Sequence, residues 1–181
     1  IKEEILLNEA DTCRKYVVPR LIQSGWDNEP HSFTEQQNFT DGRIIMVGDK
    51  PKRRKKKRAD YLLRFTRDFK IAVLEAKPMY RKPGDGLQQA KEYAEILGLK
   101  FAYATNGDGI IEFDYFTGIE RLLSEFPLPG ELWSRYCDAH KIVDAQKKER
   151  LLEFQGCSSR GRRSGYVVSW PALPGCRLPL R

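Results

Sequence analysis

The chain has 181 residues, a hydrophobic content of 40%, a charged content of 31% and a formal net charge of +7. A chain of this length can bury about 70% of the surface that it exposes when unfolded, so we expect a globular domain with a substantial core. No apolar run reaches the ~20 residues needed to cross a bilayer, and the start lacks a signal-peptide pattern, which argues against a membrane or secreted protein.

The four cysteines are widely spread without a C-x-x-C pair, and only two histidines accompany them. A zinc site or a disulfide framework needs closely spaced ligands or a regular cysteine pattern, so neither is expected. We therefore expect reduced thiols and a cytoplasmic protein.

Residues 2–24 carry an approximate apolar stripe that predicts a helix. Pro19 predicts a break in it near Val18, because proline lacks a backbone donor. Residues 28–40 are polar and predict an irregular segment, apart from a short extended piece at 32–34.

A turn at residues 41–43 and a strand over 43–47 are predicted next. They lead to an unbroken basic run, which consists of Lys52, Arg53, Arg54, Lys55, Lys56, Lys57 and Arg58. Because residues 1–150 carry a net +3 and the run alone carries +7, the rest of that segment is at −4. Like charges repel, so we expect a mobile, solvated loop. The run ends beside Asp60, a candidate site residue. We therefore predict that it contacts DNA phosphates independently of the DNA sequence.

The central stretch predicts a β-hairpin, because two apolar segments, 61–65 and 69–74, flank a short turn. Pairing at this turn brings Asp60, near the open end, level with Glu75 and Lys77. Side chains alternate along a strand, so Glu75 and Lys77 project on the same side. Two carboxylates suit a hard cation such as Mg²⁺, and the lysine can orient water or stabilise charge on a phosphate.

An amphipathic helix follows this hairpin after a Pro-Gly break. Asp85 and Gln88 have the spacing of a capping box, and Gly98 predicts the end of the helix. Gln89 and Tyr93 stand at i and i+4 and therefore share one face. On spacing alone, the pair is equally compatible with a partly buried helix face.

Taken in order, these residues carry a family resemblance. It rests on Asn8-Glu9-Ala10, Thr40-Asp41-Gly42-Arg43-Ile44-Ile45, Ala59-Asp60-Tyr61, Glu75-Ala76-Lys77, Gln89-Ala90-Lys91-Glu92-Tyr93 and Tyr103-Ala104-Thr105-Asn106-Gly107. The pattern resembles the PD-(D/E)XK nuclease superfamily, and more closely the amino-terminal nuclease domain of HsdR-type subunits of type I restriction enzymes. The similarity covers roughly residues 1–136, and Ala59 stands where the superfamily label has proline.

The resemblance implies roles for individual residues. Asp60 and Glu75 would bind Mg²⁺, with the Ala76 carbonyl as a further ligand, and Lys77 would activate or position the attacking water. Roles in supporting the reaction or holding the DNA backbone are implied for Gln89 and Tyr93, and Glu9 would lean into the active site. Without the resemblance, Glu9 would be interpreted as an ordinary exposed helix acid.

The second half of the chain predicts further strands at residues 101–104 and 110–115, joined by a turn at 106–109. A helix is predicted from residue 131 to about 152. From residue 153 onward the chain has no helical or strand period and is rich in Gly, Ser, Pro and Arg.

The predicted fold is α/β, a restriction-endonuclease-like core with a mixed central sheet flanked by helices. Residues 1–150 are predicted to form an endonuclease domain, a fragment of a larger motor and restriction subunit, and residues 151–181 an irregular tail that we interpret as vector-derived. The chain lacks a G-x-x-x-x-G-K-[S/T] loop, so ATP is expected only through motor domains outside it.

The predicted activity is Mg²⁺-dependent cleavage of double-stranded DNA within a type I restriction-modification enzyme. The resemblance implies modification and specificity subunits as partners. Two alternatives remain open. One is a stand-alone repair or recombination nuclease with the same fold, and the other is a non-catalytic DNA-binding module on a nuclease-like scaffold.

Overall fold

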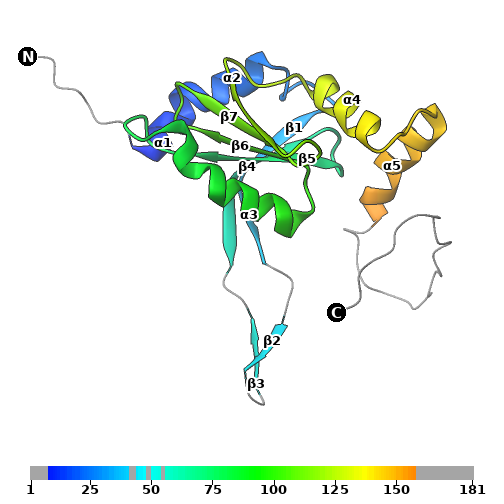
Figure 1. Ribbon diagram of the computed structural model, residues 1–181, viewed down its shortest axis with the longest axis horizontal. Coiled ribbons are helices and arrows are strands. Elements are labelled where there is room, and N and C mark those ends of the chain that lie inside the picture. Colours follow the sequence, from blue (N-terminus) through cyan, green and yellow to red (C-terminus); the bar gives the residue numbers. More distant parts are fainter. Residues whose placement is uncertain (1–7, 41–43, 48–49, 54–55, 158–181) are drawn as a thin grey trace, which may run out of the picture.

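The computed structural model describes residues 8–40, 44–47, 50–53 and 56–157. Its centre is a six-stranded sheet with the strand order β1-β4-β5-β6-β7-β8. The strands are β1 (Ser32–Phe39), β4 (Lys57–Arg64), β5 (Lys70–Ala76), β6 (Phe101–Thr105), β7 (Ile110–Asp114) and β8 (Ile119–Leu123). Neighbouring strands are antiparallel except β5 and β6, which are parallel. This mixed sheet with flanking helices confirms the predicted fold class (Figure 1).

A parallel strand pair needs a crossover connection, which here consists of the 3₁₀ turn η2 (Pro83–Gly86) and α3 (Leu87–Leu97). Gly98 ends α3 in the left-handed conformation, as the sequence predicts. The predicted capping box is wrong, because Asp85 lies inside η2 and Gly86 is the residue before the helix. Among the described residues, no side chain caps this end of α3.

Each face of the sheet has its own core. Small and branched side chains pack beneath α3 on one face: Ala59, Leu62, Val73, Ala90, Tyr93, Ala94, Leu99 and Ala102. Larger side chains fill the other face, among them Val17, Leu21, Trp26, Leu63, Phe69, Leu74, Phe101, Tyr103 and Leu132. Since successive strand residues alternate between the two cores, both faces are apolar and polar groups collect at the strand ends.

The second core is covered by α1 (Glu9–Thr12), the π-helical η1 (Cys13–Val17), α2 (Val18–Gln23) and α4 (Pro129–Ala139). The predicted break near Val18 is confirmed, since the hydrogen-bond pattern changes from π to α there. Pro19 lies just after this change and has no N–H to continue the helical hydrogen bonds of η1, as expected for proline inside a helical run.

The structure corrects two predictions about strands. The segment predicted to be irregular contains the eight-residue strand β1, which pairs with β4. The strand β8 has no counterpart among the predicted elements. Both are edge strands of the sheet and remain partly or largely exposed, so neither shows the apolar alternation by which buried strands are recognised.

The long predicted C-terminal helix is also wrong. Helix α4 ends at Ala139, and α5 (Ala145–Cys157) begins after a bend at Lys141, whose φ is +54°. Helix α5 runs past residue 153, into the segment predicted to be irregular, and it crosses the predicted domain boundary at residue 150. The rest of the tail, residues 158–181, lies outside the described ranges.

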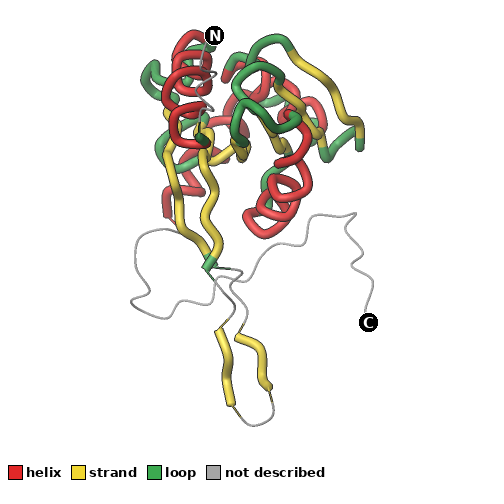
Figure 2. Tube along the Cα trace, turned by 90° about the vertical axis from the view of Figure 1, so that its left-hand side faces the viewer, coloured by secondary structure: helices red, strands yellow, loops and turns green. Residues whose placement is uncertain are grey.

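A separate hairpin is formed by β2 (Ile44–Val47) and β3 (Lys50–Arg53), which pair with each other. Both views show it projecting away from the six-stranded sheet (Figures 1 and 2). The prediction of a loop over the whole basic run is therefore wrong, because the run's first two residues belong to β3 and its last two begin β4. The predicted turn at 41–43 and residues 54–55 lie outside the described ranges.

In the part of the chain that the structure describes, no helix has both the length and the apolar character needed to span a membrane.

Candidate active site

The predicted acidic residues meet where the end of β5 pairs with the first half of β4. The antiparallel register pairs Tyr61 with Leu74, which brings Asp60 next to the end of β5. The backbone N of Ala76 donates to Asp60 Oδ2 at 2.9 Å, and the backbone N of Asp60 donates to Glu75 Oε1 at 3.3 Å. Each carboxylate is thus held by a backbone group of the opposite strand.

Lys77 and Glu75 project toward the same turn, as strand alternation predicts. A Cβ added to Gly86 would lie 3.4 Å from both Glu75 Cβ and Lys77 Cγ. The backbone N of Lys77 donates to the carbonyl of Thr105 at 2.8 Å, which fixes the chain just after β5. This face of β5 is the one that α3 covers, because Val73 belongs to the core beneath that helix.

Helix α3 extends this polar group with two side chains. Lys77 Nζ donates to Gln89 Oε1 at 3.1 Å, and Gln89 Nε2 donates to the hydroxyl of Tyr93 at 3.0 Å. Tyr93 is buried and packs edge-on against Phe39 of β1. The shared face predicted for Gln89 and Tyr93 is confirmed, and the pair fixes where the lysine ammonium lies.

Glu75 lies in surroundings that disfavour its charged form. Its side chain is 1% exposed. Burial raises its pKa to about 9, and the negative charge of Asp60 adds to the rise. The hydrogen bond from the Asp60 backbone and the charge of Lys77 act in the opposite direction but do not compensate. A buried carboxylate beside a second carboxylate is therefore a site that gains from a bound cation.

Asp60 also opens onto a cavity of about 600 Å³. Glu9, the exposed first residue of α1, lines the same cavity, so the structure brings it close to this part of the site. Asn8 caps α1 by accepting a hydrogen bond from the backbone N of Asp11 at 2.8 Å. The cap determines where the helix begins and hence where Glu9 projects.

Two further lining residues, Glu35 and Gln36, do not appear among the predicted site residues. They lie on β1, which the sequence does not reveal as a strand. The pairing of β1 with β4 is interrupted at Gln36, whose φ is +48°, between the pairs Glu35–Tyr61 and Gln37–Ala59. The interruption lies directly opposite Asp60, and positive φ at a non-glycine residue is often found beside functional sites.

Cys13, a third lining residue, is a free thiol that is hydrogen-bonded with Tyr61. Burial raises its pKa to about 11, so it stays protonated at neutral pH. Cys13 therefore does not supply a thiolate for nucleophilic or metal chemistry. Cys137 is also a free thiol.

The donor set has the composition that Mg²⁺ prefers. Across the described ranges, groups of three or more His, Cys, Asp or Glu that suit a metal are absent. The carboxylates of Asp60 and Glu75 are adjacent, because each accepts a hydrogen bond from a backbone N–H of the opposite strand. Mg²⁺ binds through one or two carboxylates and keeps several waters, so two acids and the carbonyl of Ala76 fit this ion.

A turn after β6 joins several parts of the site. A Cβ added to Gly107, whose φ is +89°, would lie 2.9 Å from atoms of both Thr12 and Tyr16. Arg20 Nη1 donates to the carbonyl of Asp108 at 2.8 Å. The turn therefore positions the amino-terminal helices, and with them Glu9, against the sheet.

The basic run is described only in part. Lys57 Nζ lies 2.9 Å from Glu92 Oε2 of α3, in a partly exposed ion pair. Arg58 lines the cavity beside Asp60, and Lys56 is exposed. Lys52 and Arg53 belong to the projecting hairpin. The predicted DNA contact of these residues remains a prediction.

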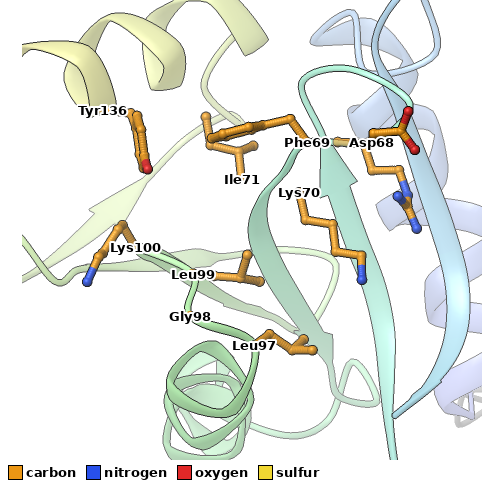
Figure 3. A pocket seen from close by; sticks show the side chains of 10 residues that line it. Asp68, Phe69, Lys70, Ile71, Leu97, Gly98, Leu99, Lys100 and Tyr136 are labelled. Atoms are coloured by element: carbon orange, nitrogen blue, oxygen red, sulfur yellow. The ribbon is translucent and has the colours of Figure 1, made fainter. Parts of the chain in front are cut away.

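A second cavity, of about 260 Å³, lies at the opposite end of β5. Figure 3 shows Leu97, Leu99 and Ile71 between the side chains of Lys70 and Lys100. Lys70, which lines this cavity, lies five residues before Glu75 on β5. Since an extended strand rises about 3.3 Å per residue, the cavity is roughly 16 Å from the carboxylates and is not part of their site.

Comparisons with known proteins show which family the chain is similar to. No family model matches the chain. It is 38% identical over 137 residues to the endonuclease subunit of the type I restriction enzyme EcoAI from Escherichia coli, which covers 72% of this chain and 17% of that protein.

A solved fragment from Vibrio vulnificus, assigned to the HsdR subunit of a type I restriction enzyme, is 61% identical with a TM-score of 0.70. That match covers 78% of this chain and 27% of the other. The chain thus spans less than a third of the length of either relative. By sequence and by fold, it is an HsdR-type segment, homologous to part of the endonuclease subunit of type I restriction enzymes.

Proposed function

We propose that this segment is a metal-dependent endonuclease domain that cleaves phosphodiester bonds of double-stranded DNA within a type I restriction enzyme. The observation that carries the proposal is the pair Asp60 and Glu75, held together on the adjacent strands β4 and β5 with Glu75 buried, and with Lys77 beside them. A domain that only binds DNA has no need for a buried, uncompensated carboxylate, which costs stability.

Asp60, Glu75 and the carbonyl of Ala76 would hold the Mg²⁺ ion. When bound, the ion would lower the pKa of a coordinated water and offset the charge of the scissile phosphate. The chain itself supplies the orientation. Asp60 and Glu75 keep their positions because each accepts a backbone hydrogen bond across the β4–β5 pair.

Lys77 would place its ammonium near the attacking water or the charge that develops on the phosphate. Gln89 accepts a hydrogen bond from the ammonium, and Tyr93 in turn fixes Gln89, so the lysine is held in one direction before DNA binds. Such preorganisation is what electrostatic stabilisation of a transition state requires. Glu9 would act from the other side of the cavity that it shares with Asp60.

The assignment to a restriction enzyme rests on the relatives. We infer that the segment works in the cytoplasm with modification and specificity subunits, that Lys52–Arg58 contact the DNA backbone, and that ATP acts only through motor domains outside this segment. A stand-alone repair or recombination nuclease would share the same site, and the 61% identity to an HsdR fragment favours the restriction enzyme.

Calorimetric titration with Mg²⁺, followed by cleavage of a linear duplex, tests the proposal. We expect Asp60→Asn and Glu75→Gln to lose metal binding. We expect Lys77→Gln to keep it while cleavage falls by at least about 100-fold, the usual size of one lost electrostatic group. Asp68→Asn, at the turn end of the same hairpin, is the matched control and should behave as the unsubstituted chain.

If Asp60→Asn and Glu75→Gln bind Mg²⁺ and cleave DNA unchanged, the carboxylates do not form the site. A chain that binds duplex DNA but shows neither metal binding nor cleavage would favour a DNA-binding module instead.

A further inference from the structure

The loop that directly follows Lys77 presents basic and aromatic side chains to solvent. Tyr80 is 62% exposed, and Arg81 and Lys82 are also exposed. Among the described residues, neither Arg81 nor Lys82 makes an ion pair or a side-chain hydrogen bond, in contrast to Lys57, which pairs with Glu92. Exposed basic groups without a protein partner are free to meet an external anion.

The backbone of this loop is held from below by Asn106. Its Nδ2 donates to the carbonyl of Arg81 at 2.8 Å and to that of Met79 at 3.4 Å. Its Oδ1 accepts from the backbone N of Asp108 and of Gly109, so all of the amide's polar groups are used. The carbonyls therefore point into the protein, while the side chains of residues 80–82 remain on the outside.

The loop and the basic run lie on opposite sides of the carboxylates. Arg58 precedes Asp60 on β4, whereas the loop leaves β5 and is tied to Asn106 at the end of β6. The strand order β4-β5-β6 therefore places Asp60 and Glu75 between two basic segments at one end of these strands. A DNA strand whose phosphate is at the carboxylates runs on past this end in both directions.

We propose that residues 80–82 form a second contact to the DNA backbone. Arg81 and Lys82 bind phosphates on the side of the cut away from Arg58, and the Tyr80 hydroxyl donates to a neighbouring phosphate. This inference rests on the proposed function, because it takes double-stranded DNA as the ligand. It adds a DNA contact beyond the basic run, on a loop already fixed in place.

The test compares Arg81→Gln/Lys82→Gln with Lys147→Gln/Arg150→Gln, which removes the same charge from exposed positions on α5. Binding of a fluorescein-labelled duplex is measured by anisotropy at several NaCl concentrations in EDTA, so that cleavage plays no part. Each lost phosphate contact reduces the salt slope by about 0.9, so the loop variant should lose about 1.8 and bind at least about tenfold more weakly at 0.1 M salt.

The α5 variant should keep the salt slope of the unsubstituted chain. Circular dichroism melts should be the same for all three proteins, because both sites are exposed. If the loop variant binds with the same slope and affinity as the α5 variant, the inference is overturned while the proposed cleavage site stands. If cleavage proves independent of Asp60 and Glu75 but the loop variant still loses its slope, the proposed function fails and the DNA contact remains.

Discussion

Buried acids in this chain are of two kinds, and their neighbours distinguish them. Glu112 and Asp114 are 1% and 3% exposed, and Arg135 reaches both from α4. Its guanidinium binds both oxygens of Glu112 at 2.9 and 2.7 Å, and Tyr103 donates to the same carboxylate at 2.6 Å. Glu75 is equally buried, but the charge with the largest effect on its pKa, that of Asp60, has the same sign. The first group is built for stability, and Glu75 is not.

The raised pKa of Glu75 predicts how stability depends on pH without metal. Its pKa rises from an ordinary 4.5 to about 9 on folding, so between these values the folded chain holds a proton that the unfolded chain has lost. Stability therefore falls as the pH rises through this range. Glu75→Gln, which mimics the protonated acid, should flatten the dependence and gain at least about 1 kcal/mol at pH 9, or ~2–4 °C in Tm.

Thermal melts in EDTA at pH 5, 7 and 9 measure this effect. Glu131→Gln, an exposed acid on α4, is the control and should leave the pH dependence unchanged. Equal pH dependence in Glu75→Gln and the unsubstituted chain would show that Glu75 is not protonated in the folded state.

Removing Arg135 should destabilise the chain, whereas Glu75→Gln should stabilise it. Arg135→Met leaves two buried carboxylates without their partner, which typically costs about 3–5 kcal/mol. Chemical denaturation checks this, with the exposed Arg150→Met expected within about 0.5 kcal/mol of the unsubstituted chain. A loss as small as that of Arg150→Met would contradict the ionic explanation.

At the scale of the elements, the turn after β6 connects the loop that follows Lys77 to the amino-terminal helices. Gly107 has little room above it and a positive φ, whereas Gly118, also at positive φ, has no heavy atom within 4 Å of an added Cβ. A comparison of alanine substitutions at the two glycines therefore distinguishes the cost of backbone strain, which applies to both, from the cost of steric contact, which applies only to Gly107.

Gly107→Ala should destabilise the chain by about 2–4 kcal/mol, because strain of order 1 kcal/mol adds to overpacking of 1–3 kcal/mol against Thr12 and Tyr16. Gly118→Ala should show only the strain. Urea denaturation gives both values. Because the clash pushes on the helices that carry Glu9, Gly107→Ala should also reduce cleavage, while Gly118→Ala should not. Equal stabilities for the two variants would mean that the helices shift at no cost.

The elements also show where sequence patterns are informative. The central hairpin and α3 were predictable because their apolar residues follow strand and helix periods and a glycine ends the helix. Strand β1 was not, because an edge strand shows only a weak version of that pattern. The adjacency of Asp60 and Glu75 followed from hairpin register alone, whereas Glu35 and Gln36 enter the cavity only through β1.

At the scale of the whole molecule, the net positive charge of residues 1–150 is concentrated in the basic run. These residues carry +3 in total and the run carries +7, so the rest of them is at −4. The sequence predicted this field, but not that part of the run would extend into a hairpin separate from the main sheet. The sequence gives the number of charged residues, whereas the strand pairing determines where in the structure they lie.

This separation allows the hairpin to be removed without disturbing the site. Phe39 of β1 pairs with Lys57 of β4, so Thr40 and Lys56 can be joined by a two-residue Asn-Gly turn in place of residues 41–55. Strands β2 and β3 pair only with each other among the described residues, so the melting temperature should change by no more than a few degrees.

Duplex binding should weaken in the shortened chain, because the replaced segment contains Lys52, Arg53, Arg54 and Lys55. If each contacts a phosphate, the slope of log affinity against log salt should fall by up to about 3.6. A full-length variant with these four residues changed to glutamine separates lost charge from lost shape, and it should match the shortened chain if charge alone matters. Unchanged salt dependence in both proteins would place the DNA contacts of this segment elsewhere, on Lys56 to Arg58 and on the loop after Lys77.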